Sequence, residues 1–162
     1  MIQPGHNGAV SWILVSTHPH KERFAVENLN RQRFVGYCPM LRKRIRHARR
    51  SELALRPMFL AHVIAGLHAD TQRWQPIRST PGVSAIVRSG ELPVFLPAGF
   101  VDALQASEVD GTVVAPTPAG SIGPGHIASG AADYRAQIAA MLEMSEHERL
   151  LSLIGLLGPP RA

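Results

Sequence analysis

Positive side chains are concentrated in one short stretch of the chain, Arg42–Arg50, which reads "RKRIRHARR". Each phosphate that such a stretch neutralises releases condensed counterions, so nucleic-acid binding would depend strongly on salt and little on base sequence. We expect the stretch to form a mobile, solvated loop, without an aromatic side chain on which bases could stack. The alternative is that this loop contacts nothing. The side chains predicted to contact nucleic acid are Arg42, Lys43, Arg44, Arg46, Arg49 and Arg50.

The distribution of charge along the chain also favours a polyanionic partner. The formal net charge of +5 divides into +8 for residues 1–107, with 14 Lys/Arg against 6 Asp/Glu, and −3 for residues 108–162, with 3 against 6. A basic body suits nucleic acid. Its acidic C-terminal segment is able to lie against the body when no partner is bound.

Residues with catalytic or metal-binding potential lack the spacing that such chemistry requires. The sequence has no G-x-S-x-G, H-E-x-x-H or C-x-x-C motif and no phosphate-cradling P-loop. His18 and His20 flank a proline with no third ligand in register, so a metal pair is not expected. Cys38, the only cysteine, is interpreted as a half-buried apolar side chain. We expect a protein that is not an enzyme and uses no metal or cofactor.

The composition indicates a cytoplasmic location. A single cysteine fits a reducing compartment. No apolar run approaches the roughly 18 residues that cross a bilayer. The start, "MIQPGHNGAV", lacks a basic segment followed by an apolar core, so no secretory signal is expected. We expect a monomer that makes no membrane contact.

An α+β scaffold is predicted to position the basic stretch. The alternation of strand-like and helix-like segments favours an antiparallel four-stranded sheet with flanking helices. The first helix should begin at Pro19 and end at Gly36, with Ala25 and Leu29 on its apolar stripe. Strands are expected at Ser11–Thr17, Gly36–Arg42, Leu55–Leu67 and Ser84–Gly90, and a second helix at Ala98–Ser107.

A Pro-Gly pair marks the best-defined turn. In "TPGV", Pro81 suits the second position of a type II turn and Gly82 the third, which needs a positive φ. Just before it, "HADTQRW" could hold a short helix with Asp70 as its cap. The predicted organisation is a disordered start (1–10), a domain (11–106), a Pro/Gly-rich linker (107–125) and a short C-terminal segment (126–162).

Several motifs in order resemble the NusG family of transcription elongation factors, and its RfaH-type branch in particular. They are Trp12 in the first strand, "ENLNRQRF" in the first helix, "YCPM", "RPMF" and above all "IRSTPGVSAIVRSGELPVFLP". The resemblance spans roughly Ser11 to Leu104 and implies an N-terminal domain that binds the clamp helices of bacterial RNA polymerase and suppresses pausing or termination. The RfaH-type branch further implies service of selected operons.

The resemblance implies two polymerase-binding regions. An apolar patch of Phe59, His62 and Ile64 would bind the clamp helices, although the family usually has an aromatic residue where this chain has His62. That substitution puts the strength or pH dependence of docking in doubt. The positions that would meet the gate loop of the polymerase are Arg73, Trp74 and Gln75.

RfaH-type proteins can also read an exposed non-template DNA strand. The matching positions, whose side chains suit hydrogen bonds to bases and phosphates, are His18, His20, Asn28, Arg31, Gln32 and Thr80. An ordinary polar helix surface is the alternative. A different class of function also stays open, in which the chain is a basic module that binds DNA or nascent nucleic acid and no longer docks on polymerase.

The C-terminal segment resembles a diverged KOW module but stops about where the last strand of the barrel should begin. Contact with a ribosomal or termination-factor partner, which needs a complete barrel, should then be weak or lost. The same residues also predict a helical hairpin that covers the polymerase-binding face, with Ser145 and Glu148 as a capping box. The side chains expected between tail and body are Tyr134, Ile138, Met141, Leu150, Leu153, Ile154 and Leu157. A degenerate, partly disordered KOW module is the alternative.

Overall fold

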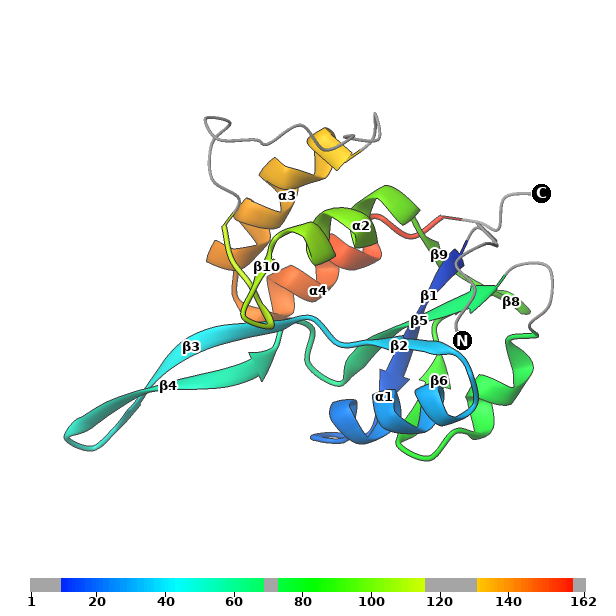
Figure 1. Ribbon diagram of the computed structural model, residues 1–162, viewed down its shortest axis with the longest axis horizontal. Helices are drawn as coiled ribbons and strands as arrows, with labels where there is room; N and C mark the ends of the chain where they lie inside the picture. The colour runs from blue at the N-terminus through cyan, green and yellow to red at the C-terminus, as the bar shows by residue number, and fades with distance from the viewer. Residues whose placement is uncertain (1–9, 69–72, 116–130, 159–162) are drawn as a thin grey trace, which may run out of the picture.

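An antiparallel sheet lies at the centre of the computed structural model, which describes residues 10–68, 73–115 and 131–158 (Figure 1). Its strands run in the order β2 (Val35–Tyr37), β5 (His62–His68), β1 (Val10–Thr17) and β6 (Val83–Ile86). A short fifth strand, β9 (Phe95–Leu96), also pairs with β1. The predicted α+β class and the antiparallel sheet are therefore confirmed.

Both faces of the sheet are buried, which explains the continuous apolar run in β1. Ile13 and Val15 point to one core, together with side chains from α1 (Glu22–Arg31) and the 3-10 helix η1 (Gln75–Ser79). Trp12 and Leu14 point to the other core, which α2 (Ala98–Ala106) and the C-terminal helices cover. Side chains alternate across a strand, so a strand between two helical layers must be apolar at every position.

The first helix is shorter than predicted at both ends. It begins at Glu22, because Pro19 lies in a turn and His20 has a φ of 60°. It ends at Arg31, because Arg33 adopts a left-handed φ of 68° and the Phe34 N–H donates to the Leu29 carbonyl at 3.1 Å. This is a Schellman motif with arginine at the position that glycine usually takes. The glycine at 36 lies in β2 instead.

The basic stretch forms part of a long β-ribbon, not the irregular loop that the sequence predicted. Strands β3 (Met40–His47) and β4 (Arg50–Pro57) pair over their whole length, and Ala48 turns between them with a φ of 48°. Figure 1 shows this ribbon projecting from the sheet. The ladder pairs the backbone groups that the two strands turn toward each other, which fixes the stretch as regular structure.

Three predicted strands are divided in the structure, and one of them, Ser84–Gly90, breaks at residue 87 between β6 in the central sheet and β7 (Arg88–Ser89) in a separate hairpin. The segment Leu55–Leu67 ends one strand at Pro57, turns at residues 58–61 and enters β5 at His62, and Ala61 has a φ of 55°. Only its second half lies in the interior of the sheet. Similarly, the segment 36–42 breaks at residues 38–39 between β2 at the sheet edge and β3 in the ribbon.

The Pro-Gly turn is confirmed. Gly82 has a φ of 92°, and the Val83 N–H donates to the Thr80 carbonyl at 3.0 Å, as a type II turn requires. A Cβ at position 82 would lie 3.0 Å from the backbone nitrogen of Ala25, so the turn packs closely on α1. The short helix predicted around Asp70 falls outside the described residues.

Small β-structures connect the turn to the second layer of helices. Strands β7 (Arg88–Ser89) and β8 (Leu92–Pro93) form one hairpin, and β10 (Glu108–Val109) and β11 (Thr112–Val113) form another. The second hairpin occupies residues that the sequence assigned to a linker. The Val114 N–H donates to the Ser107 carbonyl at 3.0 Å, which closes this hairpin onto the end of α2.

The C-terminal segment is helical, as the amphipathic pattern predicted. Helices α3 (Ala131–Glu143) and α4 (Glu146–Ile154) pack on the α2 side of the sheet (Figure 1). The predicted capping box is present: the Ser145 N–H donates to the Glu148 carboxylate at 2.9 Å, and the Glu148 N–H donates to Ser145 Oγ at 3.4 Å. Across the described ranges, no helix combines the length and the apolar character needed to span a membrane.

Candidate functional site

The apolar patch implied by the sequence is covered by the C-terminal helices. Phe59 is 1% exposed and Ile64 is fully buried. Both belong to one core cluster with the tail side chains Ile138, Met141 and Leu153, each of which is also fully buried. The two body residues and the three tail residues therefore share one apolar core, and neither Phe59 nor Ile64 is open to a partner in this conformation.

His62, the third residue of the implied patch, is partly exposed, and its ring is engaged within the body. Nδ1 lies 2.8 Å from the Leu60 carbonyl oxygen, and Nε2 lies 3.1 Å from Ser16 Oγ. A carbonyl can only accept, so Nδ1 carries the proton and, in the neutral ring, Nε2 accepts from the Ser16 hydroxyl. The ring therefore supports the turn between the ribbon and β5.

A buried carboxylate, which the sequence did not single out, supports the same turn. Glu22 is 5% exposed, and one of its oxygens accepts a hydrogen bond from the Ala61 N–H at 2.9 Å. The left-handed backbone of Ala61 leaves that N–H outside any strand ladder, so a side chain has to satisfy it. Glu22 thus holds the loop that presents Phe59.

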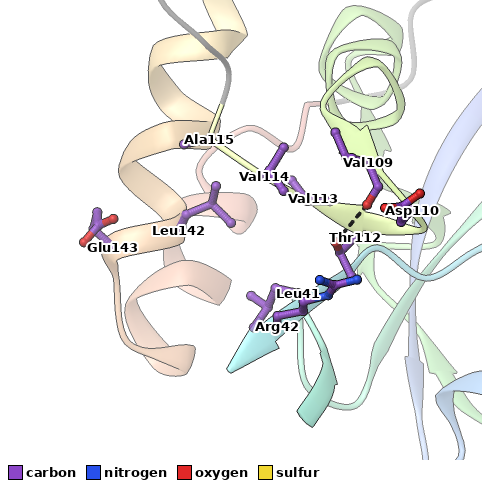
Figure 2. Close-up of a pocket in the computed structure, with 10 residues that line it drawn as sticks. All are labelled: Leu41, Arg42, Val109, Asp110, Thr112, Val113, Val114, Ala115, Leu142 and Glu143. Carbon is purple, nitrogen blue, oxygen red and sulfur yellow. Dashed lines mark hydrogen bonds between the residues drawn. The ribbon is translucent and has the colours of Figure 1, made fainter. Parts of the chain in front are cut away.

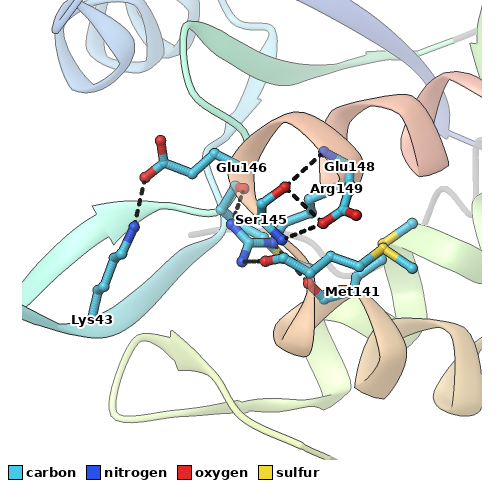
Figure 3. A network of polar contacts seen from close by, with 8 residues as sticks. Lys43, Met141, Ser145, Glu146, Glu148 and Arg149 are labelled. Carbon is cyan, nitrogen blue, oxygen red and sulfur yellow. Dashed lines mark hydrogen bonds and ion pairs between the residues drawn. The ribbon is translucent and has the colours of Figure 1, made fainter.

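Arg149 joins the tail to the body, and sequence reasoning missed it. It is 6% exposed, and its guanidinium donates to the carbonyl oxygens of Met141 (2.9 Å), Met144 (2.9 Å) and Met58 (3.1 Å) (Figure 3). The first two carbonyls lie at the C-terminal end of α3, where the helix dipole favours a positive charge. The third belongs to the body. The signal for Arg149 was its spacing of four residues from Leu153 on the inner face of α4.

Two opposite effects act on the charge of Arg149. Burial lowers the pKa of the guanidinium from its ordinary value, and the nearby Glu146 carboxylate raises it. An arginine remains charged in proteins in spite of such a shift. The three carbonyl acceptors are therefore what stabilises this cation inside the interface.

The other tail positions lie mostly as their helical spacing suggests. Tyr134 packs edge-on against the ring of Phe100, with ring centroids 5.8 Å apart and an interplanar angle of 78°. Leu150 and Leu157 are partly buried against the same cluster. Ile154, which the sequence placed in this stripe, is instead 45% exposed. Arg149 and Leu153 lie on the inward face of α4. Ile154 is the next residue after Leu153, so its side chain points about 100° away from that face.

The two faces of the ribbon differ in what they contact. Arg42, Arg44 and Arg46 alternate on one face, where Leu53 and Leu55 lie across from two of them and are 61% and 49% exposed. Lys43 lies on the other face and makes an ion pair with Glu146 of α4, with Nζ and Oε1 3.2 Å apart (Figure 3). Arg49 and Arg50, at the end of the ribbon, are exposed.

A groove of about 470 Å³ opens where the ribbon meets the tail. Its lining residues come from the β1–α1 turn, both ribbon strands, the loop after β4 and the first residue of α4. They are His20, Lys43, Arg44, Ile45, Arg46, Arg56, Leu60 and Glu146. Four of these eight are Lys or Arg, and Glu146 is the only acid, so the groove suits an anionic ligand.

A second pocket, of about 350 Å³, lies near the base of the ribbon (Figure 2). Its walls come from β3, the β10–β11 hairpin, the residues after it and the end of α3. The lining residues are Leu41, Arg42, Val109, Asp110, Thr112, Val113, Val114, Ala115, Leu142 and Glu143. The Thr112 hydroxyl donates to the Val109 carbonyl at 2.9 Å, so it is used within the hairpin. No nucleophile and base lie together among these residues.

The positions implied for reading a DNA strand are divided between open and engaged side chains. His18, His20 and Arg31 are exposed. Thr80, by contrast, is 2% exposed and accepts a hydrogen bond from Gln32 Nε2 at 2.9 Å. Thr80 and Gln32 thus fix the Pro-Gly corner to α1; Thr80 is buried there, whereas the Gln32 side chain stays exposed. The Asn28 amide donates to the Phe24 carbonyl of its own helix at 2.8 Å.

The positions implied for the gate loop lie in the α1 layer, on the face of the sheet opposite the tail. Trp74 is partly buried against the core that contains Ile77, whereas Arg73 and Gln75 are exposed just before and at the start of η1. The tail does not cover them. With the tail helices docked, the region implied for the clamp helices is therefore covered at Phe59 and Ile64, whereas the region implied for the gate loop is exposed at Arg73 and Gln75.

Two buried groups near the ribbon base are structural. Burial raises the pKa of Cys38 to about 12, so its thiol is not a reactive thiolate. Burial, and a hydrogen bond of 2.5 Å to Glu108, raise the pKa of Tyr37 above its ordinary value. That bond ties β2 to the β10–β11 hairpin. Within the described ranges, no three His, Cys, Asp or Glu side chains are grouped so as to hold a metal ion.

Comparison with protein families shows which family the sheet and the elements around it belong to. Residues 10–105 match the family model described as transcription termination factor NusG, which is more than half of the 162-residue chain. The chain belongs to the NusG family. This is a family of transcription factors, acting in elongation and termination, whose members generally bind RNA polymerase. A search of curated proteins returned no significant match. Helices α3 and α4 lie outside the matched residues.

Proposed function

We propose that this NusG-family chain is an RfaH-like elongation factor that binds the clamp helices of bacterial RNA polymerase and suppresses pausing or termination. The observation that carries the proposal is the burial of Phe59 and Ile64 beneath α3 and α4. In the family-implied mode this apolar patch is the docking surface. The described conformation would then be autoinhibited, because the tail occupies the surface that polymerase needs.

Opening of the tail would convert the closed chain into the binding form. The tail buries Ile138, Met141 and Leu153 against the patch, so its release exposes apolar area that polymerase can cover in turn. Polymerase binds only the open state and so shifts the population toward it. A factor that is mostly closed acts only where an additional contact favours opening, which fits service of selected operons.

The remaining contacts in the proposal come from surfaces that the tail leaves free, except at Lys43, which pairs with Glu146. Exposed residues at the start of η1 would meet the gate loop, and the ribbon would follow the nucleic-acid backbone. The side chains assigned to the gate loop are Arg73, Trp74 and Gln75; those assigned to nucleic acid are His18, His20, Asn28, Arg31, Gln32, Arg42, Lys43, Arg44, Arg46, Arg49 and Arg50. Most of these are polar or charged and exposed, as phosphate contacts require.

The test replaces a buried residue of the tail in the full-length chain. Leu153→Asp places a charge in the apolar interface, which the closed state cannot accommodate, so the tail should undock. We expect binding to a reconstituted elongation complex to strengthen by about tenfold or more. Leu151→Asp is the matched control, because Leu151 lies on the same helix and is 54% exposed.

Two results would count against the autoinhibited state. If Leu153→Asp and Leu151→Asp bind polymerase as the wild-type chain does, the tail does not cover the docking surface. If Leu153→Asp weakens binding, the tail takes part in docking. Circular dichroism should show that both variants keep the sheet.

His62 favours a second candidate function, a basic module that binds nucleic acid without polymerase. Its ring is used internally by Leu60 and Ser16, at a position where the family usually has an aromatic residue. Under this candidate, the Leu153→Asp variant binds free nucleic acid but no elongation complex.

A further inference from the structure

Four of the eight residues that line the groove between ribbon and tail are Lys or Arg, two (Ile45 and Leu60) are apolar, and Glu146 is the only acid among them. His20, Lys43 and Arg56 line it from the body, with Arg44 and Arg46 at its ribbon edge. The tail contributes a single lining residue, and it is the acid Glu146. Glu146 is the first residue of α4, which the capping box at Ser145 starts at that point.

The ion pair in the groove is not what holds the tail in place. The side chains of Lys43 and Glu146 are 56% and 39% exposed, and such exposed pairs contribute little to stability. The apolar cluster around Leu153 and the hydrogen bonds of Arg149 hold the tail instead. The pair therefore needs a different explanation, and the charge of the groove provides one.

We propose that this groove is a binding site for the phosphate backbone of nucleic acid, and that Glu146 occupies it as an internal competitor. The inference rests on the proposed function and adds the regulation of its nucleic-acid surface. A carboxylate at 3.2 Å from Lys43 takes the place that a phosphate oxygen takes when a strand is bound. The docked tail thus neutralises one cation of the groove and narrows access to the others.

The arginine face of the ribbon sets a baseline for nucleic-acid binding. Arg42, Arg44 and Arg46 lie on it and are exposed in the closed chain, although Arg44 and Arg46 also line the edge of the groove. The closed chain therefore binds nucleic acid through this face, and opening adds the contacts of the tail-side groove. By linkage, nucleic acid that enters the groove favours opening of the tail by the same factor by which opening favours binding.

The test measures the salt dependence of binding of the full-length chain to a short duplex DNA of mixed sequence. Glu146→Gln removes the competing charge and keeps the size of the side chain. Lys43 then becomes available to one more phosphate, so the slope of log K against log salt should steepen by about 0.9. We expect affinity at low salt to rise several-fold. The single strand of the same sequence is a second probe, for which the expected change in slope is about 0.7.

Combined substitution shows whether the effect passes through the groove. Lys43→Gln alone should change the slope little, because Glu146 already neutralises Lys43 in the closed chain. When Lys43→Gln is already present, adding Glu146→Gln should no longer steepen the slope, and a double-mutant cycle measures this loss. Asp102→Asn is the matched control: it removes the same charge from an exposed position on α2 and should leave the slope unchanged.

Each other outcome overturns the inference in a distinguishable way. If Glu146→Gln and Asp102→Asn raise affinity equally, only net charge matters and the groove is not a site. If Lys43→Gln reduces the slope in the wild-type chain while Glu146→Gln has no effect, the ribbon binds nucleic acid but the tail does not compete. If no variant binds DNA, the nucleic-acid contact fails as a whole. Binding of Leu153→Asp to the elongation complex tests the proposed function independently of all three.

Discussion

Arg149 shows how one residue can tie two parts of a chain together without an acidic partner. Its three hydrogen bonds go to carbonyl oxygens, two at the end of α3 and one, from Met58, in the body. Carbonyls at a helix end lack partners within the helix, so a buried cation that satisfies them stabilises both the hairpin and its contact with the sheet. Arg149 therefore stabilises both the connection between α3 and α4 and the contact of the tail with the body.

Replacing Arg149 should destabilise the closed chain. Arg149→Met keeps apolar bulk but leaves three buried carbonyls without their donor, which we expect to cost about 3 kcal/mol of the free energy of unfolding. Arg149→Lys keeps the charge and fewer of the hydrogen bonds, so its cost should be smaller. Urea denaturation measures both. Arg135→Met, at a partly exposed position on α3, should lie within about 0.5 kcal/mol of the wild-type chain; an equal effect of Met at both positions would contradict this role.

At the scale of elements, the limits of sequence reasoning lie in the turns. Helix α4 and its capping box follow from amphipathic spacing and from Ser145 and Glu148, because local hydrogen bonds specify a helix start. The division of the strand at residues 58–61 could not be predicted, since "MFLA" contains no Gly, Pro, Asn or Asp. Its left-handed residue, Ala61, depends on the distant carboxylate of Glu22.

The ribbon and the candidate site also show what the sequence alone could not predict. Charge density made the stretch around Lys43 resemble a loop, although it is a strand with Arg42, Arg44 and Arg46 on one face and Lys43 on the other. The apolar patch at Phe59 could be predicted from family-like motifs. The groove could not, because Glu146 is 103 residues from Lys43 and only the tertiary fold brings them together.

The capping box predicts how the stability of α4 depends on pH. Hydrogen bonds from the Ser145 hydroxyl and N–H lower the pKa of Glu148. Because the pKa is lower in the folded chain than in the unfolded one, the stabilisation is fully present above the unfolded value. It is lost as the pH falls through the folded value. Helicity of the tail, followed by NMR in mild acid, should fall in that range.

Glu148→Gln supplies the control for this prediction. A glutamine can still accept from the Ser145 N–H but does not titrate in acid. The variant should therefore show a weaker helix near neutral pH and less loss of helicity on acidification. If acidification affects both proteins alike, Glu148 does not control the start of α4.

At the scale of the whole molecule, one sheet carries two sets of proposed contacts on its two faces. The α1 layer fixes the Pro-Gly corner and holds Trp74 near the surface, and the family match covers this layer. The opposite face carries the patch of Phe59 and Ile64 under a helical tail that lies outside the match. A surface that is buried by its own chain can be regulated by how strongly that chain is held.

The most direct test of this account is whether Phe59 binds polymerase once the tail is released. In full-length Leu153→Asp, we predict that a second substitution, Phe59→Asp, reduces affinity for the elongation complex by about tenfold or more, because it removes an apolar anchor. Salt-dependent binding to free duplex DNA should be retained and shows that the fold is intact. If Phe59→Asp leaves polymerase binding unchanged, Phe59 is not part of the docking surface, and the proposal that the tail covers that surface is contradicted as well.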